Sequence, residues 1–335
     1  MTTVAVVGAT GAVGRTMLAI LEERGFAMDR LRLAASKRSA GQMVSTRQGD
    51  IELESLDDFD AVDVDIALFS AGGDRSRAHA ERFVEAGAVV IDNSSAFRMR
   101  EDVPLVVVGV NDDAAAGHVG LIANPNCTTM TLMMAAGPLH EAAGLRSMVA
   151  TSYQSVSGSG QRGVDELVGQ HHALGNDFAA LMDGSWIDPG AELYERPIAH
   201  NVLPMAGSLV EGGYTDEEMK LVNESRKILG IADLDVEPTC VRVPVLVGHG
   251  VAATLRFDRD LSADEATSIL GSAPGVELWK DRTPTPLDSV GIDEVLVGRV
   301  RETVGTPGGI NLWVVGDNLR KGAALNAVQI AELIS

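Results

Sequence analysis

Residues 4–14 have the sequence VAVVGATGAVG, in which a β-branched run ends in three regularly spaced glycines. An amphipathic stretch, Val13–Arg24, follows at once, so the segment predicts a strand, a tight loop and a helix. Gly8, Gly11 and Gly14 would let backbone N–H groups approach a pyrophosphate at the positive end of that helix. The spacing is a variant of the G-x-G-x-x-G dinucleotide fingerprint, and a plain tight turn is the competing interpretation. We therefore expect a nucleotide cofactor on this loop.

The rest of the first 126 residues continues this alternation of short strands and helices. Amphipathic stretches over 13–24 and 76–86 are each followed by a glycine at a helix C-cap position, Gly25 and Gly87. Such alternation predicts a parallel sheet covered by helices on both faces, a doubly wound Rossmann-type α/β domain. The strands expected in it are 4–8, 31–35, 65–70, 88–92, 106–110 and 121–123.

The pattern changes after about residue 147, where the strand-like runs become longer. Helical segments 165–174 and 216–229 separate them, which predicts a C-terminal α+β domain with a mixed, largely antiparallel sheet. A last amphipathic segment, 319–334, is expected to return to the first domain. We thus divide the chain into residues 1–126, residues 127–318 and a returning helix, 319–335. The strands expected in the second part are 148–156, 236–247, 251–257, 295–302 and 309–315.

The size and charge of the chain exclude some classes of function. A chain of 335 residues, 45% of them hydrophobic, is long enough for two domains with buried cores. Its formal net charge of −20 disfavours nucleic acid or an anionic membrane surface as a partner, because phosphate groups would be repelled. An anionic substrate would therefore have to be bound by a few well-placed Arg and Lys side chains.

The cysteine content and the N-terminus indicate the compartment. Two cysteines, Cys127 and Cys240, are too few for a disulfide framework and indicate a reducing environment. The first residues carry no basic segment before their apolar run, so they are typical of a strand and not of a signal peptide. No apolar stretch reaches the roughly 18–20 residues that a membrane span needs. We expect a soluble cytoplasmic protein.

The loop after the second expected strand distinguishes between the two nicotinamide cofactors. Proteins that bind NAD place a carboxylate on the ribose 2′-hydroxyl about 20 residues after the glycine loop. Here the chain reads Ser36-Lys37-Arg38-Ser39, with hydroxyls and cations in place of a carboxylate. These groups suit a 2′-phosphate, whereas a solvated basic loop is the alternative. The sequence predicts NADP as the cofactor.

Cys127 lies in a polar junction, residues 124–129 with the sequence NPNCTT. Pro125 biases the residue before it toward an extended conformation, and the apolar pattern that follows Cys127 indicates a helix. A cysteine in the first turn of a helix meets the positive end of the macrodipole, which is expected to lower its pKa. The unpaired N–H groups there could hold an oxyanion. A lone cysteine is more often inert core, but this polar setting predicts a nucleophile.

A thiolate that attacks carbonyl carbon needs a proton-transfer partner, and His249 is the best placed of the seven histidines. It lies in GHG, where glycines clear space around the side chain. Arg242 interrupts the apolar run that precedes it. Because an Arg is costly to bury without an anion, we expect Arg242 to bind a substrate carboxylate. The pair His171-His172 lacks partners at ligand spacing, so no metal site is predicted.

Two further cations are candidates for anion binding. Arg98 ends the motif DNSSAFR, just beyond the carboxyl end of a strand, where open α/β sheets bind ligands. Lys220 lies in an expected helix. On residue spacing alone, Lys220 is better explained as a helix partner of Asp216 or Glu224, each four residues away.

Taken in order, GATGAVG, DNSSAFR, ANPNCTT, SYQSVSGSG, EEMK, VRVPVLVGHG and GDNLRKGAALNA are distributed over nearly the whole chain. The set resembles the bacterial aspartate-semialdehyde dehydrogenase family. The resemblance implies an NADPH-dependent reduction of L-aspartyl 4-phosphate to L-aspartate 4-semialdehyde and phosphate, early in lysine, threonine and methionine synthesis. It also implies a homodimer or homotetramer assembled through the C-terminal domain.

The same resemblance implies roles for individual residues. Cys127 matches the nucleophile that forms a thioester, His249 the acid/base, and Gln154 the glutamine that orients the substrate. Arg242 matches the arginine that holds the substrate carboxylate, and Glu217 a carboxylate near the substrate amine. Phosphate-binding positions match Arg98 and Lys220, with Asn126 beside them, and cofactor contacts match Thr10, Gly11, Ala12, Val13, Arg38, Ser39, Ser157, Gly158 and Asn318. With Gly8, Gly14 and Ser36 these contacts make up the expected cofactor site.

Two alternative functions stay open at this point. An enzyme similar to N-acetyl-glutamyl-phosphate reductase would perform the same chemistry on a longer substrate, but NPNCTT and VRVPVLVGHG resemble the aspartate family. A non-catalytic NADP-binding protein would keep the fold alone. The intact set of Cys127, Gln154, Arg242 and His249 argues against the second alternative.

Overall fold

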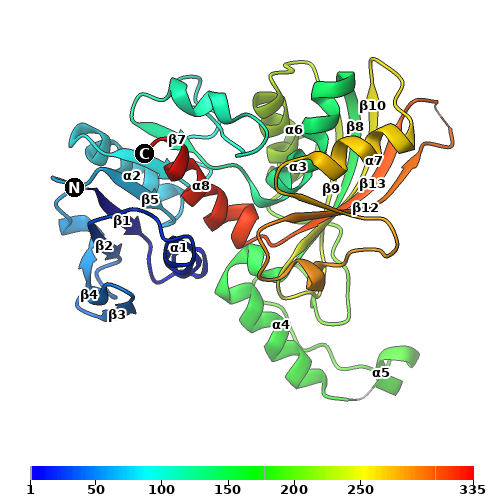
Figure 1. Ribbon diagram of the computed structural model, residues 1–335. Coiled ribbons are helices and arrows are strands. Elements are labelled where there is room, and N and C mark those ends of the chain that lie inside the picture. Colours follow the sequence, from blue (N-terminus) through cyan, green and yellow to red (C-terminus); the bar gives the residue numbers. More distant parts are fainter. Residues whose placement is uncertain (1, 177, 306) are drawn as a thin grey trace.

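The chain forms two β-sheets that lie side by side, and both marked chain ends lie beside the first of them (Figure 1). The computed structural model describes residues 2–176, 178–305 and 307–335. The first sheet has seven strands and the second has six. Helix α3 (Cys127–Ala143) follows the last strand of the first sheet and leads into the second sheet.

The first sheet is parallel except for a hairpin at one edge, and its strand order is β3-β4-β2-β1-β5-β6-β7. Alternate residues of β1 enter different cores. Val4 and Val6 pack in the layer of α1 (Ala12–Glu23), whereas Ala5 and Val7 pack in that of α2 (Gly73–Glu85). The doubly wound α/β fold expected from the sequence is confirmed. The strands are β1 (Thr3–Val7), β2 (Arg30–Ala35), β3 (Met43–Thr46), β4 (Gly49–Ser55), β5 (Ile66–Phe69), β6 (Val89–Asp92) and β7 (Leu121–Ala123).

The second sheet is mixed, with the order β11-β12-β13-β10-β8-β9. Its four inner strands pair antiparallel, whereas each edge strand pairs in parallel with its neighbour. The mixed sheet expected for this half is confirmed. Its strands are β8 (Leu145–Gln154), β9 (Asp235–Arg242), β10 (His249–Phe257), β11 (Val276–Trp279), β12 (Val295–Glu302) and β13 (Ile310–Gly316).

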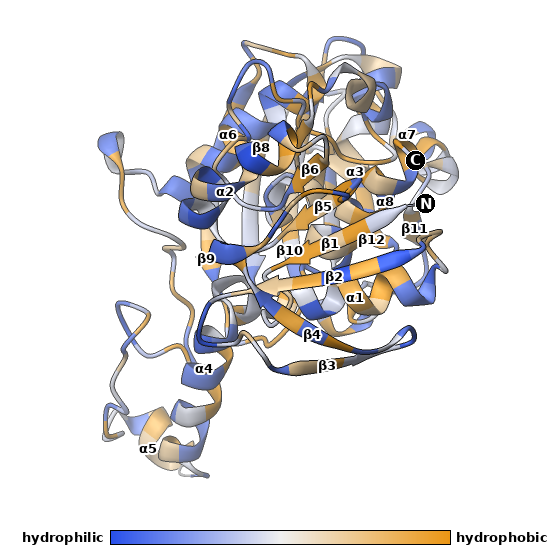
Figure 2. Ribbon diagram, turned by 90° about the vertical axis from the view of Figure 1, so that its left-hand side faces the viewer, coloured by the Kyte–Doolittle hydropathy of each residue, from blue (hydrophilic) through white to orange (hydrophobic). Residues whose placement is uncertain are grey.

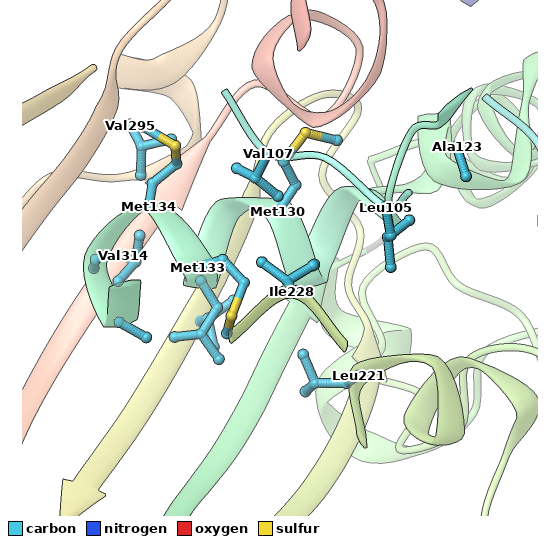
Figure 3. Close-up of a cluster of buried hydrophobic side chains, with 14 of the residues drawn as sticks. Leu105, Val107, Ala123, Met130, Met133, Met134, Leu221, Ile228, Val295 and Val314 are labelled. Carbon is cyan, nitrogen blue, oxygen red and sulfur yellow. The ribbon is translucent and has the colours of Figure 1, made fainter. Parts of the chain in front are cut away.

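Helix α3 is the centre of the core beneath the second sheet and is buried along most of its length. Its methionines, Met130, Met133 and Met134, lie among side chains of α6 (Asp216–Leu229) and of the sheet (Figure 3). Helix α7 (Ala263–Ser272) packs against α3 from another side. Because this helix is enclosed by other elements, the position of its first residue, Cys127, is fixed.

A helical arm extends away from both sheets (Figures 1 and 2). It contains α4 (Gln161–Leu174) and the short α5 (Phe178–Asp183). Figure 2 shows hydrophobic strands in the middle of the molecule, whereas this arm is mixed in hydropathy. Met182 and Ile187 on the arm are 90% and 86% exposed, so the arm carries apolar side chains into solvent.

The prediction of a strand at 106–110 is wrong. The segment is an irregular turn, preceded by one isolated bridge between Leu105 and Ala123. The side chains of Asn111 and Asn326 hydrogen-bond to backbone N–H and C=O groups of residues 105–108. One amide from the next residue along the chain and one from the C-terminal segment therefore take the place of a neighbouring strand, and an apolar run alone cannot reveal this.

Three short strands, β3, β4 and β11, are missing from the expected set. β3 and β11 are edge strands with one neighbour each, and β4 is next to the edge; most of their residues are partly or fully exposed. Edge strands carry a weaker hydrophobic pattern than central ones, and this explains the omission.

The C-terminal segment differs from the single amphipathic helix expected over 319–334. A π-helical turn, Arg320–Ala324, comes first, and α8 (Leu325–Leu333) follows. Helix α8 is buried on most sides in the core shared with α1 and the first sheet, and Arg24 pairs with Glu332 at 2.7 Å. The return of this segment to the first sheet is thus a feature of the structure. The division into units at residues 126 and 318 stays a prediction about folding.

Removing the Asn326 amide should destabilise the protein. This side chain bonds to Val108 N–H, to Val106 C=O and to the Asn124 side chain. Asn326→Leu keeps the volume but leaves buried polar groups without partners, at about 1–3 kcal/mol each. We expect a clear fall in the denaturant midpoint, measured by circular dichroism. Asn223→Leu, also in a helix and with no side-chain hydrogen bond among the described residues, is the control and should leave the midpoint nearly unchanged. Equal midpoints for the two variants would contradict the role of the amide.

Candidate active site

The glycine loop between β1 and α1 has no room for a side chain at Gly8 or at Gly14. Gly8 has φ +88°, and a Cβ there would collide with the backbone oxygen of Ser70. A Cβ on Gly14 would collide with the backbone oxygen of Gly8. Gly11 is the N-cap of α1, so the unpaired N–H groups at the beginning of this helix lie next to Thr10 and Ala12. The loop therefore has the close packing and the positive helix end that a pyrophosphate requires.

The loop after β2 lies near the glycine loop, because β1 and β2 are parallel neighbours and both loops follow carboxyl ends. Ser36 accepts a backbone hydrogen bond from Ser39, which closes a turn over residues 36–39. Arg38 is exposed, and its side chain has no hydrogen bond or ion pair within the described chain. Its guanidinium is therefore available to a ligand.

Cys127 is the first residue of α3 and lies on the wall of a pocket of about 260 Å³. Asn126 is the N-cap of this helix: its side-chain oxygen accepts from the N–H groups of Thr128 and Thr129, at 2.9 and 3.3 Å. Cys127 itself is partly buried. The N-cap thus fixes the first turn of the helix while leaving the cysteine at the pocket.

Cys127 has a raised pKa, whereas the sequence predicts a lowered one. Burial raises the pKa of this thiol to about 11, and the negative charge of Glu217 acts in the same direction. Arg242, Arg98 and the Thr128 N–H lower the pKa, but by less. The predicted lowering of the Cys127 pKa is therefore wrong, because burial raises this pKa by more than the helix start and the nearby cations lower it. The thiol is neutral in the free protein near neutral pH.

His249 is fully buried at the start of β10. Its Nδ1 accepts a hydrogen bond from the Ser155 backbone N–H at 3.1 Å, so the neutral ring carries its proton on Nε2. Nε2 has no partner among the described residues, and a Cβ on Gly158 would lie 3.1 Å from it. Burial, aided by the charge of Arg242, lowers the pKa of His249 to about 3. The ring is thus a neutral N–H donor that faces the turn at Gly158.

Arg242 and Gln154 are paired residues at the ends of β9 and β8. Arg242 is 6% exposed; its guanidinium donates to Ser155 C=O at 2.8 Å, and its Nε has no partner among the described residues. Gln154 donates to the Thr128 hydroxyl at 2.8 Å, in the first turn of α3. The two side chains are therefore held next to His249 and Cys127 respectively.

Helix α6 presents charged side chains to the same pocket. Glu217 accepts from the Asn126 side chain at 2.7 Å and from Lys220 at 2.9 Å. Lys220 also donates to Asp216 at 2.7 Å, which confirms the helix pairing with Asp216 and not the one with Glu224. Glu217 carries a lowered pKa although burial raises it, because Lys220 and Asn126 stabilise the carboxylate.

Arg98 is 7% exposed and is held on three sides. Its guanidinium donates to the backbone oxygens of Asn124 and Asn93, both at 2.9 Å, and to the Glu224 carboxylate at 3.0 Å. This arrangement orients the guanidinium at the edge of the first sheet, on the wall of the pocket that contains Cys127.

The structure brings nine of the twenty expected site residues to the wall of this pocket. Gln154, Arg242 and His249 are not on its wall; the last two lie behind the turn at Gly158, where a Cβ would be 3.0 Å from the Arg242 guanidinium. The other residues of the glycine loop and of the 36–39 turn lie farther along the first sheet. The expected residues on the wall are Val13, Arg98, Asn126, Cys127, Ser157, Gly158, Glu217, Lys220 and Asn318.

One of these expected residues, Asn318, connects three segments around the pocket. Its side-chain oxygen accepts from the Gly248 N–H at 2.8 Å and from the Ser155 hydroxyl at 3.1 Å. The segment before α8 is therefore tied to Gly248, which precedes His249, and to Ser155, whose N–H bonds to the His249 ring.

Several residues on the wall were not expected from the sequence. Gly322 is the clearest, because a Cβ there would lie 3.1 Å from the Cβ of Cys127, so the π-helical turn approaches Cys127 closely. The glycine in GDNLRKGAA is the signal that could have indicated the close approach. The other additional wall residues are Asn93, Ser95, Pro125, Leu319 and Ala323.

No group of three or more His, Cys, Asp or Glu side chains in the described part of the chain could hold a metal ion. No helix in that part is both long and apolar enough to cross a membrane.

Comparison with known proteins identifies two family domains. Residues 3–118 match the NAD-binding domain of semialdehyde dehydrogenases, and residues 137–321 match their dimerisation domain. Aspartate-semialdehyde dehydrogenase from Corynebacterium glutamicum is 52% identical, over 100% of this chain and 99% of its own length. The enzyme of the same name from Streptomyces akiyoshiensis is 53% identical, over 99% of this chain and 98% of its own length.

Solved structures agree with these matches. Aspartate semialdehyde dehydrogenase II from Vibrio cholerae, in complex with ASA, is 44% identical and superimposes with a TM-score of 0.93, over 100% of this chain and 98% of that one. A probable aspartate-semialdehyde dehydrogenase from Pseudomonas aeruginosa, 36% identical over 99% of this chain and 98% of that one, gives 0.91. The resemblance drawn from the sequence motifs is confirmed. This chain therefore belongs to the semialdehyde dehydrogenase family of oxidoreductases, among its aspartate-semialdehyde dehydrogenases.

Proposed function

We propose that the protein catalyses the reversible, NADPH-dependent reduction of L-aspartyl 4-phosphate to L-aspartate 4-semialdehyde and phosphate, in the synthesis of lysine, threonine and methionine. One observation carries the proposal: Cys127 begins a buried helix on the wall of a pocket that also contains Arg98 and Lys220. A nucleophile beside two cations suits an acyl phosphate, which reacts at carbon and releases an anion.

In the first step the sulfur of Cys127 attacks the acyl carbon, a C–S bond forms, and the C–O bond to phosphate breaks. Arg98 and Lys220 stabilise the charge of the departing phosphate. Because the thiol is neutral in the free protein, it must lose its proton as it attacks, and the departing phosphate is the base that accepts this proton. Reactants that bring positive charge next to Glu217, such as a substrate ammonium group, reduce the electrostatic cost of forming the thiolate.

His249 acts on the oxygen of the acyl carbon. Its Nε2–H faces the turn at Gly158 without a partner among the described residues, and a neutral donor there can hydrogen-bond an oxyanion as charge develops. The same atom is placed to move a proton when the thiohemiacetal on Cys127 collapses to the aldehyde. Gln154 orients the acyl group from its position on the Thr128 hydroxyl.

The other end of the substrate carries a carboxylate and an amine. Arg242 has unsatisfied N–H donors and suits the carboxylate, while Glu217 beside Asn126 suits the amine. A substrate held at both ends places its acyl carbon against Cys127 in a reactive geometry.

The cofactor fits the first sheet. The glycine loop allows a pyrophosphate to approach the start of α1, and Ser36, Arg38 and Ser39 suit a 2′-phosphate, so NADP is the expected form. When bound, this cofactor supplies the hydride. Ser157, Gly158 and Asn318 would hold its reactive end beside Cys127.

We also propose a homodimer or homotetramer that works in the cytoplasm. The matched dimerisation domain, residues 137–321, supports assembly through the C-terminal half. In the same scheme residues 1–126 bind the cofactor and residues 127–318 carry catalysis.

The purified protein should reduce NADP with aspartate semialdehyde only when phosphate is present. N-acetylglutamate semialdehyde should give little activity, because its acylated amine has no charge for Glu217. Cys127→Ala should abolish the reaction, whereas Cys240→Ser, a change at a buried strand position, should remain active. Absorbance of NADPH measures each rate. Full activity in Cys127→Ala would disprove the thioester.

The pH dependence of alkylation of the unmodified protein tests the raised pKa of Cys127. Because the pKa of Cys127 is raised to about 11, the reactive thiolate is scarce near pH 7 and increases as pH rises toward that value. Iodoacetamide should therefore label the free protein slowly near pH 7 and about tenfold faster for each unit of pH until close to the pKa. A rate that already reaches its plateau near pH 7 would show that the helix start outweighs burial.

Arg38→Ala should weaken NADP binding and leave NAD binding nearly unchanged. The loss should be about 1.5–3 kcal/mol, the range for hydrogen bonds to charged groups, or roughly tenfold to over a hundredfold in Kd. Titration calorimetry with both cofactors measures it. Arg47→Ala, on the exposed hairpin of the same sheet, is the control. Equal losses for NADP and NAD would mean that Arg38 supports the loop and does not contact the phosphate.

Substitutions at the two anion positions should affect different reactants. Arg242→Lys should raise KM for the aldehyde and lower kcat, because a point charge cannot replace a bidentate guanidinium. Lys220→Gln should mainly raise KM for phosphate. Initial rates of aldehyde oxidation, with each reactant varied in turn, provide the comparison. If both variants change both constants alike, the assignment of separate carboxylate and phosphate positions is wrong.

A further inference from the structure

Glu224 is a buried carboxylate that no step of the proposed reaction uses. It is 1% exposed and lies on α6, at helical spacing from Glu217 and Lys220, so all three face the same side. Burial raises the pKa of this carboxyl, while Arg98 and the N–H of Asn126 oppose the shift. A buried carboxylate is costly unless it is fully paired, so its partners indicate what it does.

Each oxygen of Glu224 bonds to a different part of the site. Oε1 accepts from the Arg98 guanidinium at 3.0 Å, and Oε2 accepts from the backbone N–H of Asn126 at 2.6 Å. Arg98 follows the carboxyl end of one strand of the first sheet, and Asn126 immediately precedes Cys127. One carboxylate therefore joins the proposed phosphate-binding side chain to the N-cap of the nucleophile's helix.

The other contacts of Arg98 determine which of its N–H donors are left for a ligand. A guanidinium has five N–H donors, and Arg98 uses one each for Asn124, Asn93 and Glu224. Two donors are left for an anion in the pocket that Arg98 lines. Without Glu224 the guanidinium would lose its only acidic partner among the described residues and could rotate about the bonds that remain.

We propose that Glu224 is a positioning residue that holds Arg98 and the Asn126–Cys127 turn in one fixed relation, so that phosphate binds at the correct distance from the nucleophile. The inference rests on the proposed function, because it assigns the free donors of Arg98 to phosphate. It adds a residue that touches neither substrate nor cofactor and that acts through two others.

Glu224→Gln is the test, because the amide keeps the shape but has one acceptor oxygen where two are needed. Its NH2 group must face either Arg98 or the Asn126 N–H. We expect Kd for inorganic phosphate, from calorimetry, and KM for phosphate to rise at least about tenfold, the scale of a lost charge-assisted bond. KM for the aldehyde should change less than about threefold. Unchanged phosphate Kd in a folded variant, or no phosphate binding by the unmodified protein, would overturn the inference.

Glu218→Gln is the matched control. Glu218 is also a buried carboxylate on α6, but it accepts from the backbone N–H groups of Thr215 and Cys240, away from the pocket. The Glu218→Gln variant should leave both Kd and KM for phosphate nearly unchanged. The same rise in both variants would show a general loosening of α6, and this too would overturn the inference.

A double variant covers the case in which Glu224→Gln does not fold. Arg98→Gln/Glu224→Gln removes both charges together and leaves no unpaired buried ion. If Glu224 acts on phosphate through Arg98, the double variant should bind phosphate no more weakly than Arg98→Gln alone. Weaker phosphate binding by the double variant than by Arg98→Gln alone would contradict the inference. Calorimetry keeps this result separate from the function, because a protein that binds phosphate but is inactive with aspartate semialdehyde contradicts only the proposed reaction.

Discussion

The burial of helix α3 is the constraint on which the site depends. The helix starts directly after the last strand of the first sheet and is enclosed by α6, α7 and the second sheet. An apolar helix that is buried on most sides can neither turn nor slide without breaking close packing. Its first residue, Cys127, is therefore fixed between the two sheets. The glycine at 322 lets the π-helical turn pack against it.

Two cations on the pocket wall are paired locally, although the chain as a whole carries −20. Arg98 pairs with Glu224, and Lys220 pairs with Asp216 and Glu217. The two proton-carrying groups, Cys127 and His249, are both neutral near neutral pH, because burial shifts their pKa values in opposite directions. A site of this kind develops charge only when reactants arrive, in surroundings that are already oriented to receive it.

The fold was largely predictable because its signals are local. The glycine loop, the alternation of strands and helices, and the change of pattern near residue 147 each depend on short stretches of chain. The failures occurred where distant residues decide. The backbone of 105–108 is satisfied in part by Asn326, from the other end of the chain, so no strand forms there. Helix α8 is buried by elements that are distant in sequence, so its pattern was misinterpreted as amphipathic.

The sequence by itself determined the residue types of the proposed site: a cysteine at a helix start, cations near strand ends, and a glycine loop before a helix. Only the tertiary structure decided their environment. Cys127 has a raised pKa because distant segments bury it and because Glu217 lies near, and neither effect depends on residues adjacent in sequence. On residue spacing alone Glu224 is one of two possible helix partners of Lys220, and only the folded chain brings it to Arg98 and Asn126. Desolvation and ion pairing depend on which residues are neighbours in the folded protein, and for this reason the sequence alone could not specify them.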